Sequence, residues 1–178
     1  FRRGLIGSAR FAPDGQTILY SASWDGRPME IFQTRLDSPE SRPLGLVHAK
    51  VLSISPQGQM AILLDPSRRQ GYFSLGTLAV VPLTGGTPRE LLEDVIAADW
   101  TPDGKELCVS RLQPNAEGTI ELPPGTILPG APRATSRADM LRLSRDGRHV
   151  VFRDLGAEKV MIVDRERNCR RVVDCVEG

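Results

Sequence analysis

One short turn motif occurs four times in this chain, and it constrains the fold more than any other feature. In its first copy, Pro13 presets the backbone angle that the second residue of a type I turn needs. Asp14 suits the next position, and Gly15 can adopt the positive φ that closes the turn. Apolar residues follow at once, in the alternating pattern of a strand. The motif therefore predicts a β-hairpin at each copy.

The four copies recur at a nearly constant spacing. Their turn glycines are 43, 46 and 43 residues apart, at Gly15, Gly58, Gly104 and Gly147. A large apolar residue stands four positions before each glycine, at Phe11, Ile54, Trp100 and Leu143. An apolar triplet follows each glycine, at residues 18–20, 61–63, 107–109 and 150–152. A period of roughly 40–45 residues with about four short strands is typical of the blades of a β-propeller.

We therefore expect an all-β chain that forms one propeller segment over residues 1–178. It should contain about four blades of 40–46 residues, each with four strands. The expected blades cover approximately residues 7–46, 50–92, 96–129 and 139–176. A single four-stranded sheet buries neither face alone, so stacking against neighbouring blades supplies the continuous core. The longest loop is expected at residues 65–75, between the second and third strands of blade two.

The repeated motif resembles the Pro-Asp-Gly variant of the WD-type repeat that is found in TolB-like propellers. The resemblance covers nearly the whole chain. Gln57 replaces the aspartate in the second copy and Arg145 replaces the proline in the fourth, but both copies keep the turn glycine. The resemblance implies six or more blades, so we expect this segment to be part of a larger propeller.

Residues 23–46 and 87–111 also resemble the propeller regions appended to bacterial serine/threonine protein kinases. This second resemblance implies a sensory or docking module attached to a signalling enzyme, and nothing catalytic in this segment. It further implies a bacterial protein, for which an extracytoplasmic or periplasmic location is favoured over a cytoplasmic one.

The sequence contains no motif of a known active site. It lacks a Gly-x-Ser-x-Gly elbow, because the glycines and serine of residues 71–76 have the wrong spacing, and it lacks a phosphate-binding loop. The two histidines, His48 and His149, stand far apart in the sequence and do not suggest a base or a metal ligand. The recurring aspartates are explained by turn chemistry. We expect no enzymatic activity, no cofactor and no metal ion.

Composition excludes some partners. A formal net charge of +1 does not favour nucleic acid, and no apolar run is long enough to enter a membrane directly. Three cysteines at irregular spacing form neither a disulfide framework nor a zinc motif. Cys108 lies in an apolar triplet and is expected in the core. Cys169 and Cys175 can pair in an oxidising compartment, although nothing in the sequence requires it.

Two loops form the candidate interaction surface. Its residues are Trp24, Asp25 and Arg27 in blade one, and Arg68, Arg69, Tyr72 and Phe73 in the long loop of blade two. Loops positioned by a rigid scaffold are frequent binding sites, and Arg and aromatic residues are frequent at interface hot spots. The structural alternative is that Trp24 and Phe73 only cover the core of their blades.

We therefore expect a non-catalytic propeller segment that serves as a protein-interaction or ligand-sensing module, with a protein or a small ligand as its partner. Two alternatives stay open: the propeller gate of a prolyl-oligopeptidase-like hydrolase, and a structural envelope propeller of the TolB-like type. Four blades that do not close leave apolar faces bare, including that of Ile18 and Tyr20 or its opposite. The segment should then either associate with a second copy to complete a ring, or belong to a longer chain.

Overall fold

All regular structure in the described part of the chain is β-strand. The computed structural model describes residues 3–69, 73–115, 117–131 and 138–173, without the side chains of residues 39, 68, 69 and 73. Fourteen strands form three sheets in these residues, and they include no helix. The all-β class expected from the sequence is confirmed.

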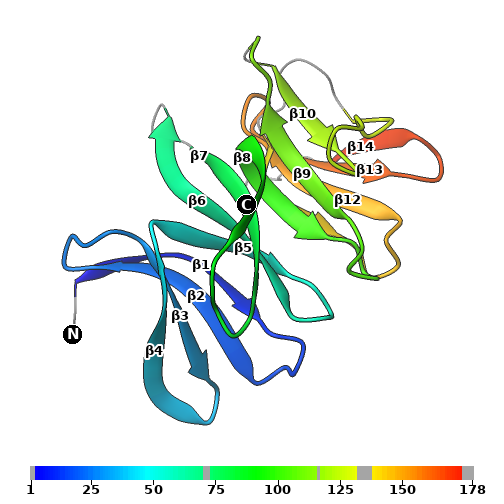
Figure 1. The fold of residues 1–178 in the computed structure, drawn as a ribbon. Coiled ribbons are helices and arrows are strands. Elements are labelled where there is room, and N and C mark those ends of the chain that lie inside the picture. Colours follow the sequence, from blue (N-terminus) through cyan, green and yellow to red (C-terminus); the bar gives the residue numbers. More distant parts are fainter. Residues whose placement is uncertain (1–2, 70–72, 116, 132–137, 174–178) are drawn as a thin grey trace, which may run out of the picture. The chain divides into compact units, whose positions relative to one another are not determined.

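The first sheet contains the first repeat, in the strand order β1-β2-β3-β4 (Figure 1). Its strands are β1 (Gly4–Phe11), β2 (Thr17–Trp24), β3 (Glu30–Arg35) and β4 (Ser38–Val47). Leu19 is fully buried, whereas its neighbour Tyr20 points to the other face and is only half-buried. Tyr20 stacks there on Phe32 of β3, with ring centroids 5.4 Å apart. One face of this sheet therefore enters the core and the other is aromatic and partly exposed.

The second sheet has the order β10-β9-β8-β7-β6-β5. Its strands are β5 (Ala49–Ile54), β6 (Gln59–Arg69), β7 (Phe73–Pro82), β8 (Arg89–Trp100), β9 (Leu107–Leu112) and β10 (Gly118–Glu121). Strand β8 serves two repeats, because its first part ends repeat two and its second part begins repeat three. Asp94, at the change between them, has a φ of 60°, and His48 between β4 and β5 has a φ of 55°.

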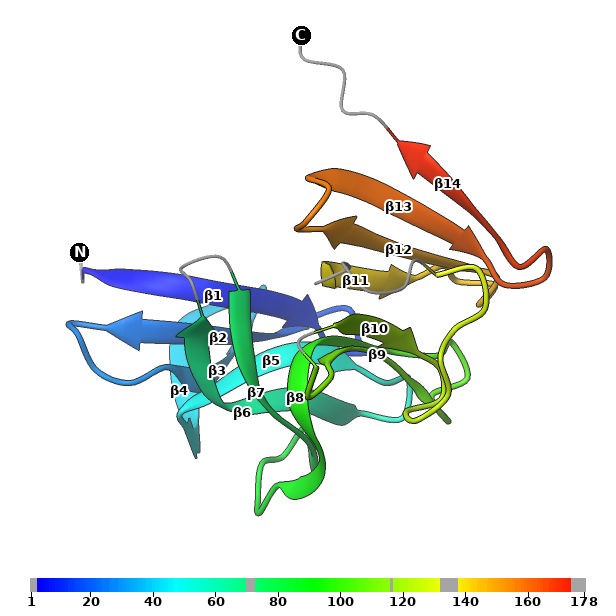
Figure 2. The same cartoon turned by 90° about the horizontal axis from the view of Figure 1, so that it is seen from above.

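The third sheet contains the fourth repeat. Its strands, β11 (Ala138–Leu143), β12 (His149–Asp154), β13 (Lys159–Asp164) and β14 (Cys169–Val173), lie side by side in sequence order (Figure 2). Strands β11 and β12 pair antiparallel, as do β12 with β13 and β13 with β14. Residues 150, 152, 161 and 163 are buried, and the alternate residues 151, 160 and 162 are half-buried.

All four predicted turns are present with the same backbone hydrogen bond. The N–H of the turn glycine donates to the carbonyl three residues earlier at 2.8–3.0 Å, in the pairs Gly15–Ala12, Gly58–Ser55, Gly104–Thr101 and Gly147–Ser144. The glycines have φ between 66° and 77°, which an L side chain adopts only at a cost. The second hairpin is shorter by one residue, since Ser55 N–H donates to Gln59 whereas Ala12 N–H donates to Thr17. Residues 60–62 are therefore the counterpart of residues 18–20.

The chain divides into two compact units, Phe1–Ser67 with Leu75–Glu93 and Arg68–Ser74 with Asp94–Gly178. In the first unit, the first sheet contributes Leu19, Ile31 and Leu46 to one core cluster, and the second sheet contributes Met60, Ile62, Ala79 and Val81. In the second unit, Ala97, Cys108 and Ile120 pack with Val150, Phe152, Met161 and Val163. Each large apolar side chain so buried contributes roughly 1.5–3 kcal/mol. Cys108 is fully buried, as predicted.

The expected long loop at residues 65–75 is wrong. Strand β6 continues to Arg69, and β7 begins at Phe73. Non-local hydrogen bonds extend the strand pairing past the turn-forming residues that suggested a loop. Asp65 N–H donates to His48 carbonyl at 2.7 Å, and Ser67 Oγ donates to Leu75 carbonyl at 3.2 Å.

Repeat three differs from the others in the described residues. After β10 it has a single bridge, between Glu121 and Ile127, in place of a fourth strand. Pro123 and Pro124 lie in this stretch and have no N–H to donate to a neighbouring strand. The described residues also contain no helix long and apolar enough to span a membrane.

Candidate functional site

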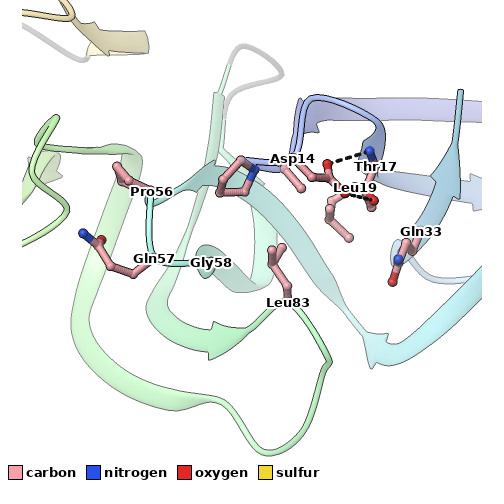
Figure 3. Close-up of a pocket in the computed structure, with 10 residues that line it drawn as sticks. Asp14, Thr17, Leu19, Gln33, Pro56, Gln57, Gly58 and Leu83 are labelled. Carbon is pink, nitrogen blue, oxygen red and sulfur yellow. Dashed lines mark hydrogen bonds between the residues drawn. The ribbon is translucent and has the colours of Figure 1, made fainter.

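A cavity of about 340 Å³ lies between the turns of the first two repeats (Figure 3). This turn cavity belongs entirely to the first compact unit. Its lining residues are Ala12, Pro13, Asp14, Thr17, Leu19, Gln33, Pro56, Gln57, Gly58 and Leu83. Ligand sites of proteins commonly begin at about this volume and combine apolar walls with a few polar groups.

The apolar part of the turn cavity is held by the fold itself. Leu19 is fully buried and Ala12 is 6 % exposed, so both belong to the core as well as to the cavity wall. Leu83 N–H donates to Gly58 carbonyl at 3.0 Å, which fixes Leu83 beside the second turn. A Cβ added at Gly58 would lie 3.2 Å from Leu83 Cδ1. Glycine at this position therefore allows the turn and the leucine to meet.

Asp14 supplies negative charge to the turn cavity. Its Oδ1 accepts the N–H groups of Gln16 at 3.0 Å and Thr17 at 2.8 Å, and its Oδ2 accepts the Thr17 hydroxyl at 2.7 Å. These hydrogen bonds, the one from the Thr17 side chain above all, lower the pKa of Asp14 from 3.8 to about 2. A carboxylate offers about four acceptor sites. Asp14 thus stays ionised at neutral pH and keeps an acceptor site for a ligand.

The second turn, which also borders the turn cavity, lacks the aspartate that makes these hydrogen bonds in the other turns. In the third and fourth turns, Asp103 and Asp146 accept from Thr101 and Ser144 hydroxyls at 2.6 and 2.5 Å, and their pKa values are lowered. In the shorter second turn, Ser55 Oγ accepts the Gln59 N–H at 3.0 Å. The position that holds aspartate in the other turns is Gln57, which lines the turn cavity.

Gln33 lies on the β3 side of the same cavity. Its Oε1 accepts a hydrogen bond from Arg42 Nη2 at 2.9 Å, which orients the amide. This hydrogen bond uses only the amide oxygen, so within the described structure the Nε2 of Gln33 can donate a hydrogen bond to a ligand. The turn cavity therefore presents an apolar wall with a carboxylate acceptor and an amide donor at its edge (Figure 3).

A second cavity, of about 310 Å³, gathers three of the predicted interaction residues. This loop cavity also lies in the first unit, on the aromatic face of the first sheet. Its lining residues are Ala22, Trp24, Asp25, Arg27, Pro28, Glu30, Phe32, Ser41 and Pro43. The structure brings Trp24, Asp25 and Arg27 together, and their role in binding stays a prediction.

The backbone of this loop explains how the three side chains come together. Trp24 is the last residue of β2, and Arg27 N–H donates to its carbonyl at 2.9 Å, which closes a turn. Asp25 has a φ of 53°, a conformation that aspartate tolerates better than most residues. The Trp24 ring covers Gly4 of β1 so closely that a Cβ there would overlap it. Trp24 is therefore also a structural residue of the sheet edge.

For the other candidate residues the structure describes at most the backbone. Arg68 and Arg69 end β6 and Phe73 begins β7, so they belong to strands and not to a loop. Their side chains and the whole of Tyr72 lie outside the described residues. The two histidines are separate as well. His48 is exposed at the junction of β4 and β5, and His149 Nε2 is 3.8 Å from Asp164 Oδ2.

Most of the turn cavity has no signal in the sequence. Leu83 and Gln33 belong to no motif and come from distant parts of the chain. Gln57 was recognised only as a departure from the repeat, and that departure is the one local signal for this site. Among the described residues no group of three or more His, Cys, Asp or Glu side chains is arranged to hold a metal ion.

Comparison with protein-family models gives no match, and comparison with curated proteins gives none either. Solved structures do match. TolB from Acinetobacter baumannii is 20% identical, with a TM-score of 0.69 over 98% of this chain and 44% of that one. A putative TolB from Agrobacterium tumefaciens is 21% identical, with a TM-score of 0.72 over 98% of this chain and 64% of that one. The β-propeller domain of the Trilobed protease from Pyrococcus furiosus is 13% identical, with a TM-score of 0.56 over 98% and 58%.

These matches confirm the predicted fold. The chain is a partial β-propeller of TolB-like form, and it spans less than two thirds of each of these three structures. Identities of this size establish the fold alone.

Proposed function

We propose that this chain is a non-catalytic β-propeller segment that recognises an extended segment of a partner protein at the turn cavity. The observation that supports this most is the combination of an apolar wall with one acceptor and one donor at its edge. The backbone of an extended peptide presents one N–H and one C=O per residue. Its N–H can donate to Asp14 and its C=O can accept from the Gln33 amide.

The apolar wall selects the peptide side chain. Leu19, Ala12 and Leu83 form a surface that an aliphatic side chain can cover, and burying such a side chain gains roughly 1.5–3 kcal/mol. A serine is too short and polar to cover this apolar wall, and a glutamate would be repelled by Asp14. The proposed ligand is therefore a peptide with an aliphatic residue such as leucine at its centre.

The wider role follows from the resemblance of residues 23–46 and 87–111 to kinase-appended propellers. We place this recognition module in bacterial signalling, outside the cytoplasm, without catalytic activity of its own. A second candidate is the propeller gate of a peptidase, which the similarity to the Trilobed protease domain favours. The gene that encodes the chain distinguishes the two, since a kinase domain supports the first and a serine-hydrolase domain supports the second. A TolB-like structural propeller of the envelope would have neither.

A photo-crosslinking experiment tests the peptide site. The probe is a blocked tripeptide with photo-leucine between two glycines, and crosslinked residues are mapped by mass spectrometry. We expect crosslinks at residues 12–19, 56–58 and 83, and competition by the leucine tripeptide but not by its serine or glutamate analogue. Crosslinks centred on Trp24, or equal competition by all three peptides, would contradict the proposal.

A matched pair of variants makes the test specific. Gln57→Trp places a large side chain at the cavity wall and should abolish crosslinking. Arg145→Trp makes the same kind of change in the fourth turn, away from the cavity, and should leave crosslinking intact. Both residues are exposed turn residues, so neither substitution removes a core contact.

A further inference from the structure

Aspartate followed directly by glycine occurs at four places in the chain. The pairs are Asp14-Gly15, Asp25-Gly26, Asp103-Gly104 and Asp146-Gly147. Such a pair can rearrange chemically, because glycine has no side chain to hinder attack of its backbone nitrogen on the aspartate carboxyl. The four pairs have the same reactive groups, so a difference between them in the folded chain comes from their surroundings.

Three of the pairs are protected on the glycine side. The N–H groups of Gly15, Gly104 and Gly147 donate to the carbonyl three residues earlier, at 2.8–3.0 Å. The glycine nitrogen has to lose its proton and turn toward the aspartate before it can attack. The hydrogen bond that closes each turn must therefore break first.

The same three pairs are also protected on the aspartate side. Asp14 accepts two hydrogen bonds from Thr17, drawn as dashed lines in Figure 3. Asp103 and Asp146 each accept a hydroxyl, at 2.6 and 2.5 Å, and a backbone N–H, at 3.2 and 3.0 Å. These bonds hold the carboxylates in place and lower the pKa of all three. The protonated carboxyl, which loses water most readily, is therefore scarce at these turns.

The pair Asp25-Gly26 has neither protection, because it stands one position earlier in its turn. Both residues have positive φ, 53° and 76°, and the N–H of Arg27 closes the turn by donating to Trp24 carbonyl at 2.9 Å. The glycine N–H is not needed for this closure. In the part of the chain that the structure describes, neither the Asp25 carboxylate nor the Gly26 N–H has a hydrogen-bond partner.

Water reaches Asp25 and Gly26, since both are exposed. This exposure belongs to their place in the repeat. In the second unit the fourth repeat packs on the third, and the turn of the fourth repeat between β12 and β13 is still exposed at residues 156–158. A preceding repeat therefore leaves this turn open to water.

We propose that Asp25-Gly26 is the site at which the folded chain isomerises to isoaspartate, ahead of the other three pairs. The Gly26 nitrogen attacks Cγ of Asp25, a C–N bond forms, and the carboxyl hydroxyl leaves with the amide proton as water. Water then adds to the main-chain carbonyl carbon of residue 25 in the resulting succinimide and breaks its bond to the nitrogen. The chain now continues through Cγ. One water is released and one is taken up, so the step needs no other reactant.

Isomerisation changes the loop cavity and leaves the turn cavity as it is. The product has one more backbone carbon between Trp24 and Arg27, and its carboxylate is attached directly to Cα. Trp24, Asp25 and Arg27 line the loop cavity and none of them lines the turn cavity. The proposal is therefore independent of peptide binding at the turn cavity.

The first test incubates the 178-residue chain at mildly acidic pH and measures isoaspartate at each pair by peptide mapping. Chymotrypsin, which cleaves after Tyr20, separates Asp14 from Asp25. We expect product at Asp25 to form roughly tenfold faster or more than at Asp14, Asp103 or Asp146, because hydrogen bonds must break at those three. In urea the four rates should converge. Equal rates in the folded chain, or a faster rate at another pair than at Asp25, would overturn the proposal.

The second test removes one protecting hydrogen bond. Thr17→Val leaves Asp14 without the hydroxyl that donates to it at 2.7 Å, and should raise the rate at Asp14 several-fold without changing the rate at Asp25. Thr34→Val is the matched control, because the Thr34 hydroxyl donates only to backbone carbonyls. It should change neither rate. An unchanged rate at Asp14 in Thr17→Val, with a fold that circular dichroism shows to be intact, would contradict the proposed protection. The comparison of the folded and urea-treated parent chain tests the proposal without any variant.

Discussion

Arg10 of β1 donates its Nε to the carbonyl of Leu52 of β5 at 2.6 Å, across forty-two residues of sequence. The contact is one of three, because Ser21 Oγ accepts the N–H of Val51 and Ser8 Oγ donates to the carbonyl of Val51, both at 2.7 Å. All three backbone groups belong to the bulged part of β5, where the ladder shifts between Val51 and Ser53. Side chains of the first repeat thus satisfy backbone groups that the bulge withdraws from the ladder.

Ser21→Ala should destabilise the chain. Ser21 and Val51 are both fully buried, so the substitution leaves the Val51 N–H without an acceptor. We expect a loss of roughly 1–3 kcal/mol in the free energy of unfolding, measured by urea denaturation. Ser53→Ala is the matched control, since the buried Ser53 hydroxyl has no hydrogen-bond partner in the described structure. It should leave stability unchanged or raise it, and equal losses in the two variants would contradict this account.

Gly76→Ala should be among the most damaging substitutions in the chain. A Cβ at this position would overlap the Leu64 carbonyl oxygen, a backbone atom that cannot move away freely. We expect a loss of about 3 kcal/mol or more in thermal unfolding. A Cβ added at Gly26 meets no atom within 4 Å. Gly26→Ala therefore has only the cost of placing an L residue at a φ of 76°, about 1–2 kcal/mol. A Gly76→Ala variant as stable as Gly26→Ala would show that β6 and β7 are not packed as described.

The turn aspartates predict how stability depends on pH. The folded-state pKa of Asp14 is about 2, below its ordinary value of 3.8, because hydrogen bonds from Thr17 and Gln16 favour the ionised form. Its contribution to stability is therefore present above pH 3.8 and is lost as pH falls from there towards about 2. Asp14→Asn keeps an acceptor oxygen but does not titrate. Its stability should fall less steeply over this interval than that of the parent chain, and parallel curves would contradict the prediction.

Two cysteines should react at very different rates. Cys108 is fully buried, and burial raises the pKa of its thiol, so the reactive thiolate is scarce. Cys169 is exposed. With iodoacetamide and peptide mapping, we expect Cys169 to be labelled in the native chain and Cys108 only in denaturant. Rapid labelling of Cys108 without denaturant would mean that the core of the second unit opens.

The hairpins could be predicted from the sequence because their causes are local. Pro13, Asp14 and Gly15 determine the first turn by their own backbone preferences and short hydrogen bonds, and the glycine spacing then defines the repeats. That the second hairpin is one residue shorter than the others could not be predicted from the sequence. Residues 60–64 are all apolar, so an apolar triplet can be chosen in either register there.

The remainder depends on contacts between distant residues. Residues 65–69 have the composition of a loop, yet hydrogen bonds to His48 and Leu75 hold them in a strand. The turn cavity forms because Leu83 and Gln33 lie next to the first two turns. No local sequence pattern indicates that these distant residues come together there. By contrast, Trp24, Asp25 and Arg27 are neighbours in sequence, so their grouping could be predicted.

The most direct test of the peptide-recognition proposal is a nuclear magnetic resonance titration. The chain is labelled at the leucine methyl groups and glycine amides and titrated with the blocked Gly-Leu-Gly tripeptide. We predict saturable shifts at the Leu19 and Leu83 methyls and the Gly58 amide, and none of them in Gln57→Trp. Unchanged spectra at saturating peptide, or shifts centred on the Gly4 and Gly26 amides beside the loop cavity, would contradict the proposal.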